Sequence, residues 1–190
     1  TAPIFNKVKN IPLLDKVIEA FGFSTKREMP EVQNLTPLKE IYKTQPTFEK
    51  KVILLADTFN INFEVKNIMY AIKVLNKFGF QAIIPSFDDN NLSRPLCCGR
   101  TYISYGQMDK AKFEMNRVTN YLYNNGYAEM PVVGIEPSCL LTFNDEFKAL
   151  KGIENRDKLK NKFYLIEEFI LEQIKEGNKV NAHAYNKNVL

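Results

Sequence analysis

The stretch KVILLA, residues 51–56, decides the fold class of this chain of 190 residues. It is short and apolar and lacks the alternation of a half-exposed strand, so it predicts a strand buried on both faces. Two further short apolar runs have the same character, FQAIIP at residues 80–85 and PVVGI at residues 131–135. Such strands separated by helical patterns are typical of a parallel α/β sheet with right-handed crossovers.

The segments between these strands have helical periodicity. Apolar residues recur at steps of three and four over residues 63–78, which end before Gly79, and over residues 102–124, which end at Asn-Asn-Gly. We expect another helix to begin near Ser138. The sequence therefore predicts helices between successive strands.

The last third of the chain contains the clearest amphipathic pattern. Residues 156–176 predict one continuous helix, and residues 179–183 predict a fourth strand after it. The apolar face of the expected helix consists of Leu159, Phe163, Ile166, Ile170 and Ile174.

The first 48 residues differ in texture, because Pro12, Pro30, Pro37 and Pro46 interrupt short apolar runs. Short helices at Leu13–Phe21 and Leu38–Tyr42 are the most that this pattern supports. We therefore expect a Pro-broken helical connector over residues 1–48 and an α/β domain over residues 49–178. The fold class is a Rossmann-like parallel sheet with helices on both faces, preceded by an irregular helical N-terminal segment.

Composition excludes several classes of protein. The 45% apolar and 25% charged fractions are ordinary globular values, and no run of 18 apolar residues predicts a membrane span. The net charge of +4 is spread without a basic stripe, so we expect no nucleic-acid partner. The N-terminus lacks the pattern of a signal peptide, and three cysteines without an even framework fit a reducing cytoplasm.

All three cysteines fall in loops between an expected strand and the following helix. In parallel sheets such loops, here 56–63, 86–101 and 136–140, carry the functional groups. A thiol at a helix N-terminus has its thiolate stabilised, and Arg100 would add positive charge beside Cys98. Cys98 and Cys139 are one α/β unit apart and can approach in space. On spacing alone, however, adjacent cysteines are more often small buried residues, and the chain has no Cys-x-x-Cys.

Two motifs in this order resemble a known family. LCCGRTYISYG at residues 96–106, followed by GIEPSC at residues 134–139, is similar to the cysteine-rich CCG domain. That domain occurs in heterodisulfide reductase subunits and in the iron–sulfur parts of FAD-linked dehydrogenases for D-lactate, glycolate and related 2-hydroxy acids. DTF at residues 57–59, followed by Phe63-Glu64, looks like the start of the same module. The resemblance spans about residues 45–190, and Gly22 with Arg27-x-x-Pro30 looks like its lead-in.

The resemblance implies electron transfer through an iron–sulfur cluster of the 4Fe-4S kind, with FAD on a partner domain or chain. Cys97, Cys98 and Cys139 match cysteines of the family pattern and would be the metal ligands. Two positions depart from the fullest pattern, because Thr58 and Glu136 stand where it has further cysteines. With Gly99 and Arg100, these two residues would line the cofactor pocket, and three thiols remain where a cluster normally takes four. No catalytic residue is assigned to the chain.

The C-terminal residues 179–190 look like the start of a second, absent CCG module. NAHAYNK at residues 181–187 is similar to its opening motif H-x-H-C-H-Q-K, but only His183 and Lys187 match. The resemblance makes His183 a candidate cofactor-binding residue, whereas a single histidine at a strand end is by itself more often structural.

Three hypotheses of function follow. The first is an iron–sulfur electron-transfer domain or fragment of a FAD-linked 2-hydroxy-acid dehydrogenase, partnered by a FAD-binding domain or subunit. In this hypothesis the chain is cytoplasmic, and peripheral association with a membrane electron acceptor is left open. The second is a degenerate CCG module without a cluster that acts as a docking or scaffold domain. In the third, Arg100 and the helix N-terminus after Gly99 bind a small carboxylate or phosphate directly.

Overall fold

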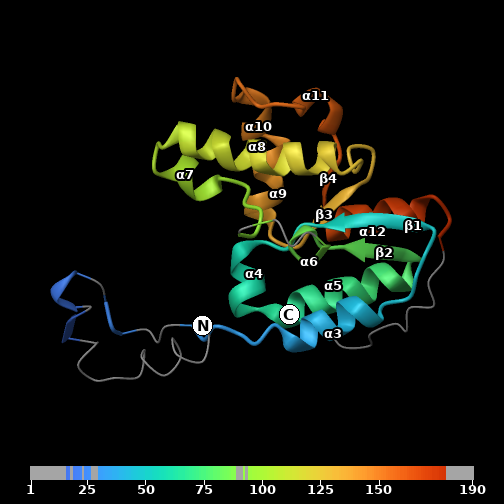
Figure 1. Ribbon diagram of the computed structural model, residues 1–190, viewed down its shortest axis with the longest axis horizontal. Coiled ribbons are helices and arrows are strands. Elements are labelled where there is room, and N and C mark those ends of the chain that lie inside the picture. The colour runs from blue at the N-terminus through green and yellow to red at the C-terminus, as the bar shows by residue number, and fades with distance from the viewer. Residues whose placement is uncertain are drawn as a thin grey trace.

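Four parallel strands form one sheet, in the order β2-β1-β3-β4, within the part of the chain that the computed structural model describes. The described residues are 16–17, 19–22, 24–26, 30–88, 92 and 94–178. The strands are β1 (Lys50–Leu54), β2 (Phe80–Ile83), β3 (Val132–Gly134) and β4 (Phe163–Leu165). Helices cover both faces of this sheet (Figure 1), which confirms the predicted fold class.

The helices fall into two layers. Those on one side of the sheet are α3 (Thr36–Thr44), α4 (Thr58–Phe63), α5 (Val65–Lys77) and α12 (Ile166–Lys175). The short helix α6 (Pro85–Asp88) packs on the same side, since its Phe87 meets Tyr42 of α3 with ring centroids 5.3 Å apart. The helices on the other side are α7 (Arg100–Ser104), α8 (Met108–Asn124), α9 (Pro137–Asn144), α10 (Glu146–Ala149) and α11 (Arg156–Leu159). No helix among the described residues is long and apolar enough to cross a membrane.

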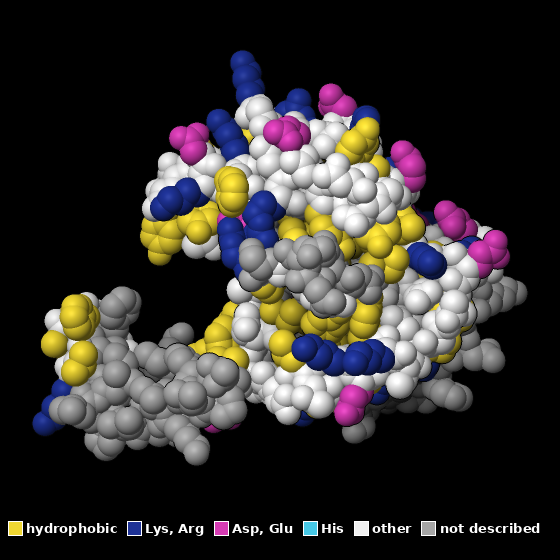
Figure 2. Space-filling model, viewed as in Figure 1, with side chains coloured by type: hydrophobic (Ala, Val, Ile, Leu, Met, Phe, Trp, Pro, Cys, Tyr) yellow, Lys and Arg dark blue, Asp and Glu magenta, His cyan; other side chains and the backbone are white. Residues whose placement is uncertain are grey.

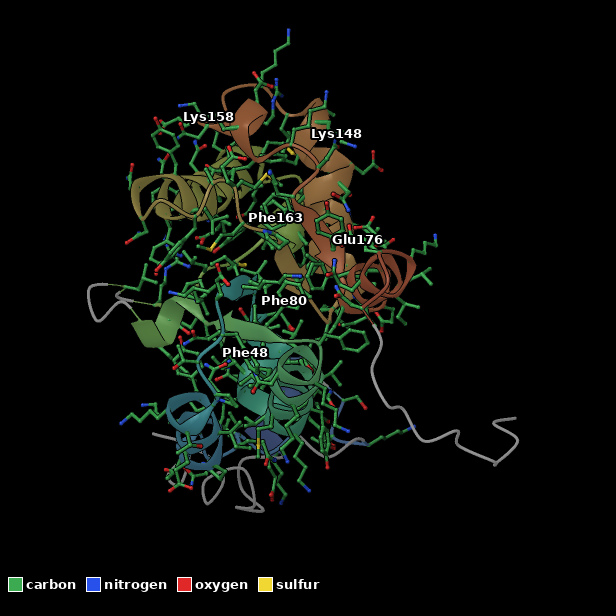
Figure 3. All side chains as sticks on the ribbon, turned by 90° about the vertical axis from the view of Figure 1, so that its right-hand side faces the viewer. Phe48, Phe80, Lys148, Lys158, Phe163 and Glu176 are labelled. Carbon is green, nitrogen blue, oxygen red and sulfur yellow. The ribbon has the colours of Figure 1, made fainter. Side chains whose placement is uncertain are left out.

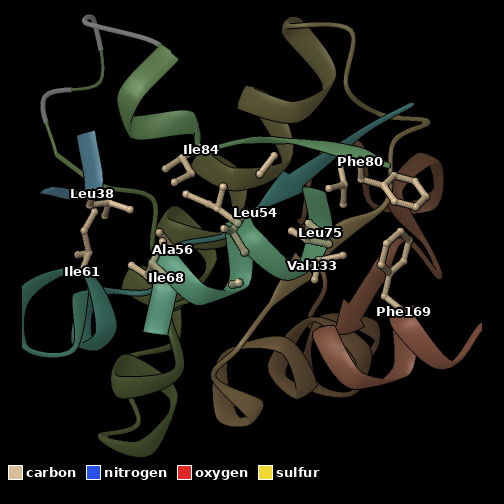
Figure 4. Close-up of a cluster of buried hydrophobic side chains, with 14 of the residues drawn as sticks. Leu38, Leu54, Ala56, Ile61, Ile68, Leu75, Phe80, Ile84, Val133 and Phe169 are labelled. Atoms are coloured by element: carbon tan, nitrogen blue, oxygen red, sulfur yellow. The ribbon is translucent and has the colours of Figure 1, made fainter. Parts of the chain in front are cut away.

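The central strand β1 is buried on both faces, as its sequence predicts. Val52 and Leu54 belong to the core beneath α3, α5 and α12, whereas Ile53 and Leu55 belong to the core beneath α8 and α9. Figure 4 shows the first of these cores, in which the rings of Phe80 and Phe169 meet edge to face with centroids 5.0 Å apart. Because both faces are covered, every residue of the strand interior must be apolar.

The helix expected over residues 102–124 is divided in two. Gly106 has φ +71° and ends α7, with its N–H donating to the Ile103 carbonyl at 2.9 Å. The next N–H, that of Gln107, donates to the Tyr102 carbonyl at 2.8 Å, and α8 then starts in a new direction. The chain therefore passes from the cysteine loop through a short helix before α8 begins.

The prediction of a single helix over residues 156–176 is wrong, because strand β4 lies in the middle of that range. Asn161 has φ +60° and ends the turn after α11, and the next residues pair with β3. Phe163 is 3% exposed and stacks on Phe143, with ring centroids 4.3 Å apart. Strand pairing and this aromatic stack together outweigh the helical period. Figure 3 shows Phe163 and Phe80 on opposite sides of the sheet.

The buried face of α12 agrees with the expected one in part, because Ile166 and Ile170 are partly buried against the core. Phe169 and Gln173 are its buried residues, whereas Ile174 is 54% exposed. The helix ends at Gly177, as expected, where φ is +92°. The fourth strand expected at residues 179–183 lies outside the described residues, so β4 is the fourth strand that the structure shows.

Part of the N-terminal segment packs onto the sheet domain. Helix α3 contains the expected helix at 38–42, and its Leu38 is fully buried against the sheet core, beside Ile61 (Figure 4). Gln45 follows it and pairs with the backbone of Ala82, donating from Nε2 at 2.9 Å and accepting at Oε1 at 3.0 Å. The side chain of Gln45 thus occupies the hydrogen-bonding edge of β2. Of the other expected helix, 13–21, the described residues 16–17 and 19–20 are helical, and Phe21 N donates to the Val17 carbonyl at 3.1 Å. The boundary at residue 48 stays a prediction.

Candidate cysteine site

The candidate site lies where the strand order reverses. Strand β1 has β2 on one side and β3 on the other, so the loops leaving β1 and β3 separate and open a crevice at their carboxyl ends. A pocket of about 640 Å³ occupies this position, lined by residues from segments 55–59, 96–102 and 136–139. Figure 2 shows the surface hollowed between α7 and α4, with hydrophobic side chains along the hollow. These are the three loops in which the sequence predicted function.

The three cysteines come together in one wall of this pocket. The Cys98 thiol donates to the Cys139 sulfur, with the two Sγ atoms 3.2 Å apart, and the thiols of Cys97 and Cys98 also form a hydrogen bond. Cys98 is buried, whereas Cys97 and Cys139 are half-buried. The backbone N–H groups of Gly99 and Arg100 donate to the sulfurs of Cys97 and Cys98 respectively, each at 3.5 Å. The expected approach of Cys98 to Cys139 is confirmed.

A position at a helix N-terminus is expected to lower the pKa of a thiol, but the pKa values of Cys97 and Cys98 are raised. The hydrogen bond to Cys139 and burial raise the pKa of Cys98 to about 12, although the hydrogen bond with Cys97 acts in the opposite direction. The hydrogen bond with Cys98 and burial also raise the pKa of Cys97. As arranged here, Cys97 and Cys98 are therefore protonated at neutral pH, and a ligand role would require them to lose their protons.

Arg100 and Gly99 have defined structural partners. The Arg100 guanidinium forms an ion pair with Glu146 of α10, so its charge is compensated rather than directed only at the thiols. Gly99 has φ +79°, and a Cβ there would lie 2.9 Å from the Ala111 carbonyl oxygen. The Cys-Cys-Gly turn is therefore packed tightly against α8, which only glycine allows.

Thr58 and Glu136, the residues at the departing positions, both line the pocket. Glu136 caps α9, because its Oε1 accepts from Ser138 N at 3.2 Å and from Ser138 Oγ at 2.8 Å. Thr58 is exposed at the first turn of α4, which the preceding Asp57 caps by accepting from Phe59 N and Asn60 N. The carboxylate of Glu136 is thus a helix cap as well as a pocket wall.

An ion-pair network beside the cysteine loop was not predicted from the sequence. Glu114 of α8 is 2% exposed and pairs with Arg94 and with Arg117, whose Nη1 lies 2.8 Å from its Oε2. Arg117 also donates to the carbonyls of Arg94 at 2.8 Å and of Pro95 at 3.3 Å. The segment just before Cys97 is therefore fastened to α8. The spacing of Glu114 and Arg117 on the expected helix was a usable signal, whereas Arg94 gave none.

The donor set fits an iron–sulfur cluster in kind but not in number. Three soft thiols share one pocket wall, but the chain has only these three cysteines. Within the described part of the chain, no group of three or more Cys, His, Asp or Glu side chains is arranged to hold a metal ion. The sulfurs of Cys98 and Cys139 are joined by a hydrogen bond at 3.2 Å, which both residues would have to give up in order to bind a metal. Arg27 and His183 lie outside the described residues.

Two curated proteins are similar to the chain. The D-2-hydroxyglutarate dehydrogenase of Pantoea ananatis (strain AJ13355) is 24% identical over 121 residues, which are 64% of this chain and 11% of that protein. The D-2-hydroxyglutarate dehydrogenase of Escherichia coli (strain K12) is 22% identical over 105 residues, 55% of this chain and 10% of that protein. Each match thus spans about a tenth of the relative's length. The similarity supports the broad relationship to 2-hydroxy-acid dehydrogenases that the motifs indicated.

Neither a protein-family model nor a solved structure matches the chain. The likeness to the CCG domain itself therefore rests on the motifs at residues 96–106 and 134–139.

Proposed function

We propose that the chain is an iron–sulfur electron-transfer domain or fragment of a FAD-linked 2-hydroxy-acid dehydrogenase. The observation that carries this proposal is the convergence of Cys97, Cys98 and Cys139 on one pocket at the reversal of strand order. Similarity to two D-2-hydroxyglutarate dehydrogenases supports the dehydrogenase context. When bound, the cluster would accept electrons and pass them on, because soft sulfur ligands hold iron in both of its redox states.

The residues of the chain would then act on the sulfurs. Cys97, Cys98 and Cys139 would give up their protons and their mutual hydrogen bonds, which frees each sulfur for a metal. The N–H groups of Gly99 and Arg100, which already point at the sulfurs of Cys97 and Cys98, would stabilise the thiolates. The Glu114 network holds the loop so that these groups stay together. Thr58 and Glu136 would line the pocket without supplying sulfur.

A fourth ligand would come from outside residues 1–190 or from a group other than cysteine, because the chain has three thiols. The flavin and the hydroxy-acid chemistry would belong to a FAD-binding domain or subunit.

Anaerobic reconstitution with ferrous iron and sulfide tests this proposal. We expect broad visible absorption with near-stoichiometric bound iron, lost in Cys97→Ser and in Cys139→Ser. Ser104→Ala is the matched control, because its hydroxyl lies on α7 but donates to the Arg100 carbonyl at 3.2 Å rather than to a cysteine sulfur. No absorption band, or an identical band in Cys97→Ser, would contradict the proposal for this chain.

A second function is favoured by one observation. The Cys98 thiol forms a hydrogen bond to the Cys139 sulfur at 3.2 Å, as two protonated cysteines in an ordinary protein core would. A cluster-free module of this kind would serve for docking to the dehydrogenase. It predicts that a variant with all three cysteines changed to serine still copurifies with a FAD-binding partner, whereas reconstitution of the unchanged chain yields no bound iron.

A further inference from the structure

We infer that Cys98 and Cys139 are an oxidisable dithiol that closes to an intramolecular disulfide and leaves Cys97 as a free thiol. This inference goes beyond the proposed function and does not depend on it, since it concerns the chain without metal.

The distance between the two sulfurs carries the inference. The Sγ atoms are 3.2 Å apart, and a disulfide bond is about 2.05 Å long, so a shift of about 1.2 Å closes it. Cys98 lies in the loop before α7 and Cys139 in the first turn of α9, and close packing at a glycine restrains each segment. A Cβ on Gly99 would meet Ala111 at 2.9 Å, and one on Gly134 would meet Leu140 at 2.2 Å. The pair is therefore held together by the fold rather than by chance contact of mobile side chains.

The pocket gives a small oxidant access to the pair. Both sulfurs belong to residues that line the pocket of about 640 Å³, and Cys139 is the more exposed of the two. Hydrogen peroxide would oxidise the Cys139 sulfur to a sulfenic acid and be reduced to water. The Cys98 sulfur would then attack that sulfur, forming the S–S bond and releasing a second water. In total, two thiols and one peroxide give one disulfide and two waters.

Cys97 is poorly placed to form a disulfide with either Cys98 or Cys139. Cys97 and Cys98 are adjacent in sequence, and Cα atoms across a trans peptide lie about 3.8 Å apart, below the range of about 4.4–6.8 Å usual for disulfides. The sulfur 3.2 Å from Cys139 is that of Cys98, whereas the Cys97 sulfur accepts from the N–H of Gly99 at 3.5 Å. The geometry thus selects one pair among the three thiols.

Oxidation of the metal-free chain with peroxide tests the inference. We expect the number of free thiols, counted in denaturant, to fall from three to one. The intact mass should fall by two hydrogen atoms, a proteolytic fragment should link Cys98 to Cys139, and dithiothreitol should reverse both changes.

The cysteine variants separate this outcome from others. Cys97→Ser should form the disulfide in the same yield, whereas Cys98→Ser and Cys139→Ser should form none, with circular dichroism confirming that each is folded. A disulfide that contains Cys97, a disulfide-linked dimer, or three thiols unchanged after peroxide would overturn the inference. The oxidation test uses metal-free protein, whereas the test of the proposed function uses iron and sulfide. The disulfide inference and the iron–sulfur proposal can therefore fail independently of each other.

Discussion

Among the charged side chains that the structure describes, Glu114 is the most deeply buried, and it lies beside the candidate site. It is 2% exposed and accepts from both Arg94 and Arg117. Burial acts to raise the pKa of its carboxyl, but the hydrogen bonds and charges of the two arginines outweigh burial and lower it. The network therefore stabilises the ionised form, and it ties the cysteine loop to α8.

We expect Glu114→Ala to destabilise the chain by about 2 kcal/mol at pH 7, because both arginines lose a charged hydrogen-bond partner. Urea denaturation measures this loss. Asp109→Ala is the matched control on the same helix, because Asp109 is fully exposed and lies 3.9 Å from Lys112. A surface pair of that kind should change stability by less than about 0.5 kcal/mol.

The difference in stability between the unchanged chain and Glu114→Ala should depend on pH. A lowered pKa in the folded state means that Glu114 contributes stability above the pKa of the unfolded chain and loses it as the pH falls through the folded pKa. The difference between the unchanged chain and Glu114→Ala should therefore shrink below about pH 4. A difference that stays constant from pH 7 to pH 3 would show that the side chain acts by packing alone.

At the scale of elements, the junction of the Cys-Cys-Gly turn with α8 sets the position of the thiols. We expect Gly99→Ala to cost about 1 kcal/mol for its positive φ and about 1–3 kcal/mol more for the clash with Ala111. Thermal or urea unfolding measures the loss, and disulfide formation by Cys98 and Cys139 should slow in the same variant.

Gly106 provides the control for this substitution. It also has positive φ, +71°, but a Cβ there would meet nothing within 4 Å. Gly106→Ala should thus show only the backbone cost of about 1 kcal/mol and normal disulfide formation. Equal losses in the two variants would mean that the turn is not packed as described.

The elements also show which parts of the fold the sequence could predict. The strands at 51–56, 80–85 and 131–135 were predictable because a strand buried on both faces is apolar throughout. Strand β4 was not, since Phe163 fits a helical face equally well and only its stack on Phe143 and pairing with β3 decide the outcome. For the site, strand-to-helix loops predicted which thiols would meet. The raised pKa of Cys98 could not be predicted, because it depends on a hydrogen bond to Cys139, which is distant in sequence, and on burial.

For the molecule as a whole, Gln45 links the N-terminal segment to the sheet. Its side-chain amide donates to the Ala82 carbonyl and accepts from the Ala82 N–H, as the backbone of a neighbouring strand would do. Ala82 itself is fully buried. We expect Gln45→Ala to destabilise the chain by about 2 kcal/mol, because a buried N–H and a buried carbonyl lose their partners. Faster amide exchange at Ala82 should accompany the loss.

Thr44→Ala serves as the comparison, since its exposed hydroxyl donates to the Glu40 carbonyl within α3 at 2.8 Å. That variant should leave exchange at Ala82 unchanged. If Gln45→Ala behaves in the same way, α3 is held by Leu38 and its apolar neighbours alone.

The pairing of Gln45 with β2 also bears on whether another strand could join the sheet. On the β2 border, part of the ladder is already occupied by a side chain, and an incoming strand would have to displace it. On the β4 border, side chains likewise bond to the strand backbone, because Asn144 Nδ2 donates to the Phe163 carbonyl at 3.2 Å and Glu168 Oε2 accepts from Leu165 N at 3.0 Å. An incoming strand at either border, from a later part of the same polypeptide or from another chain, would therefore have to displace side chains that already hold the backbone, which protects both edges from pairing.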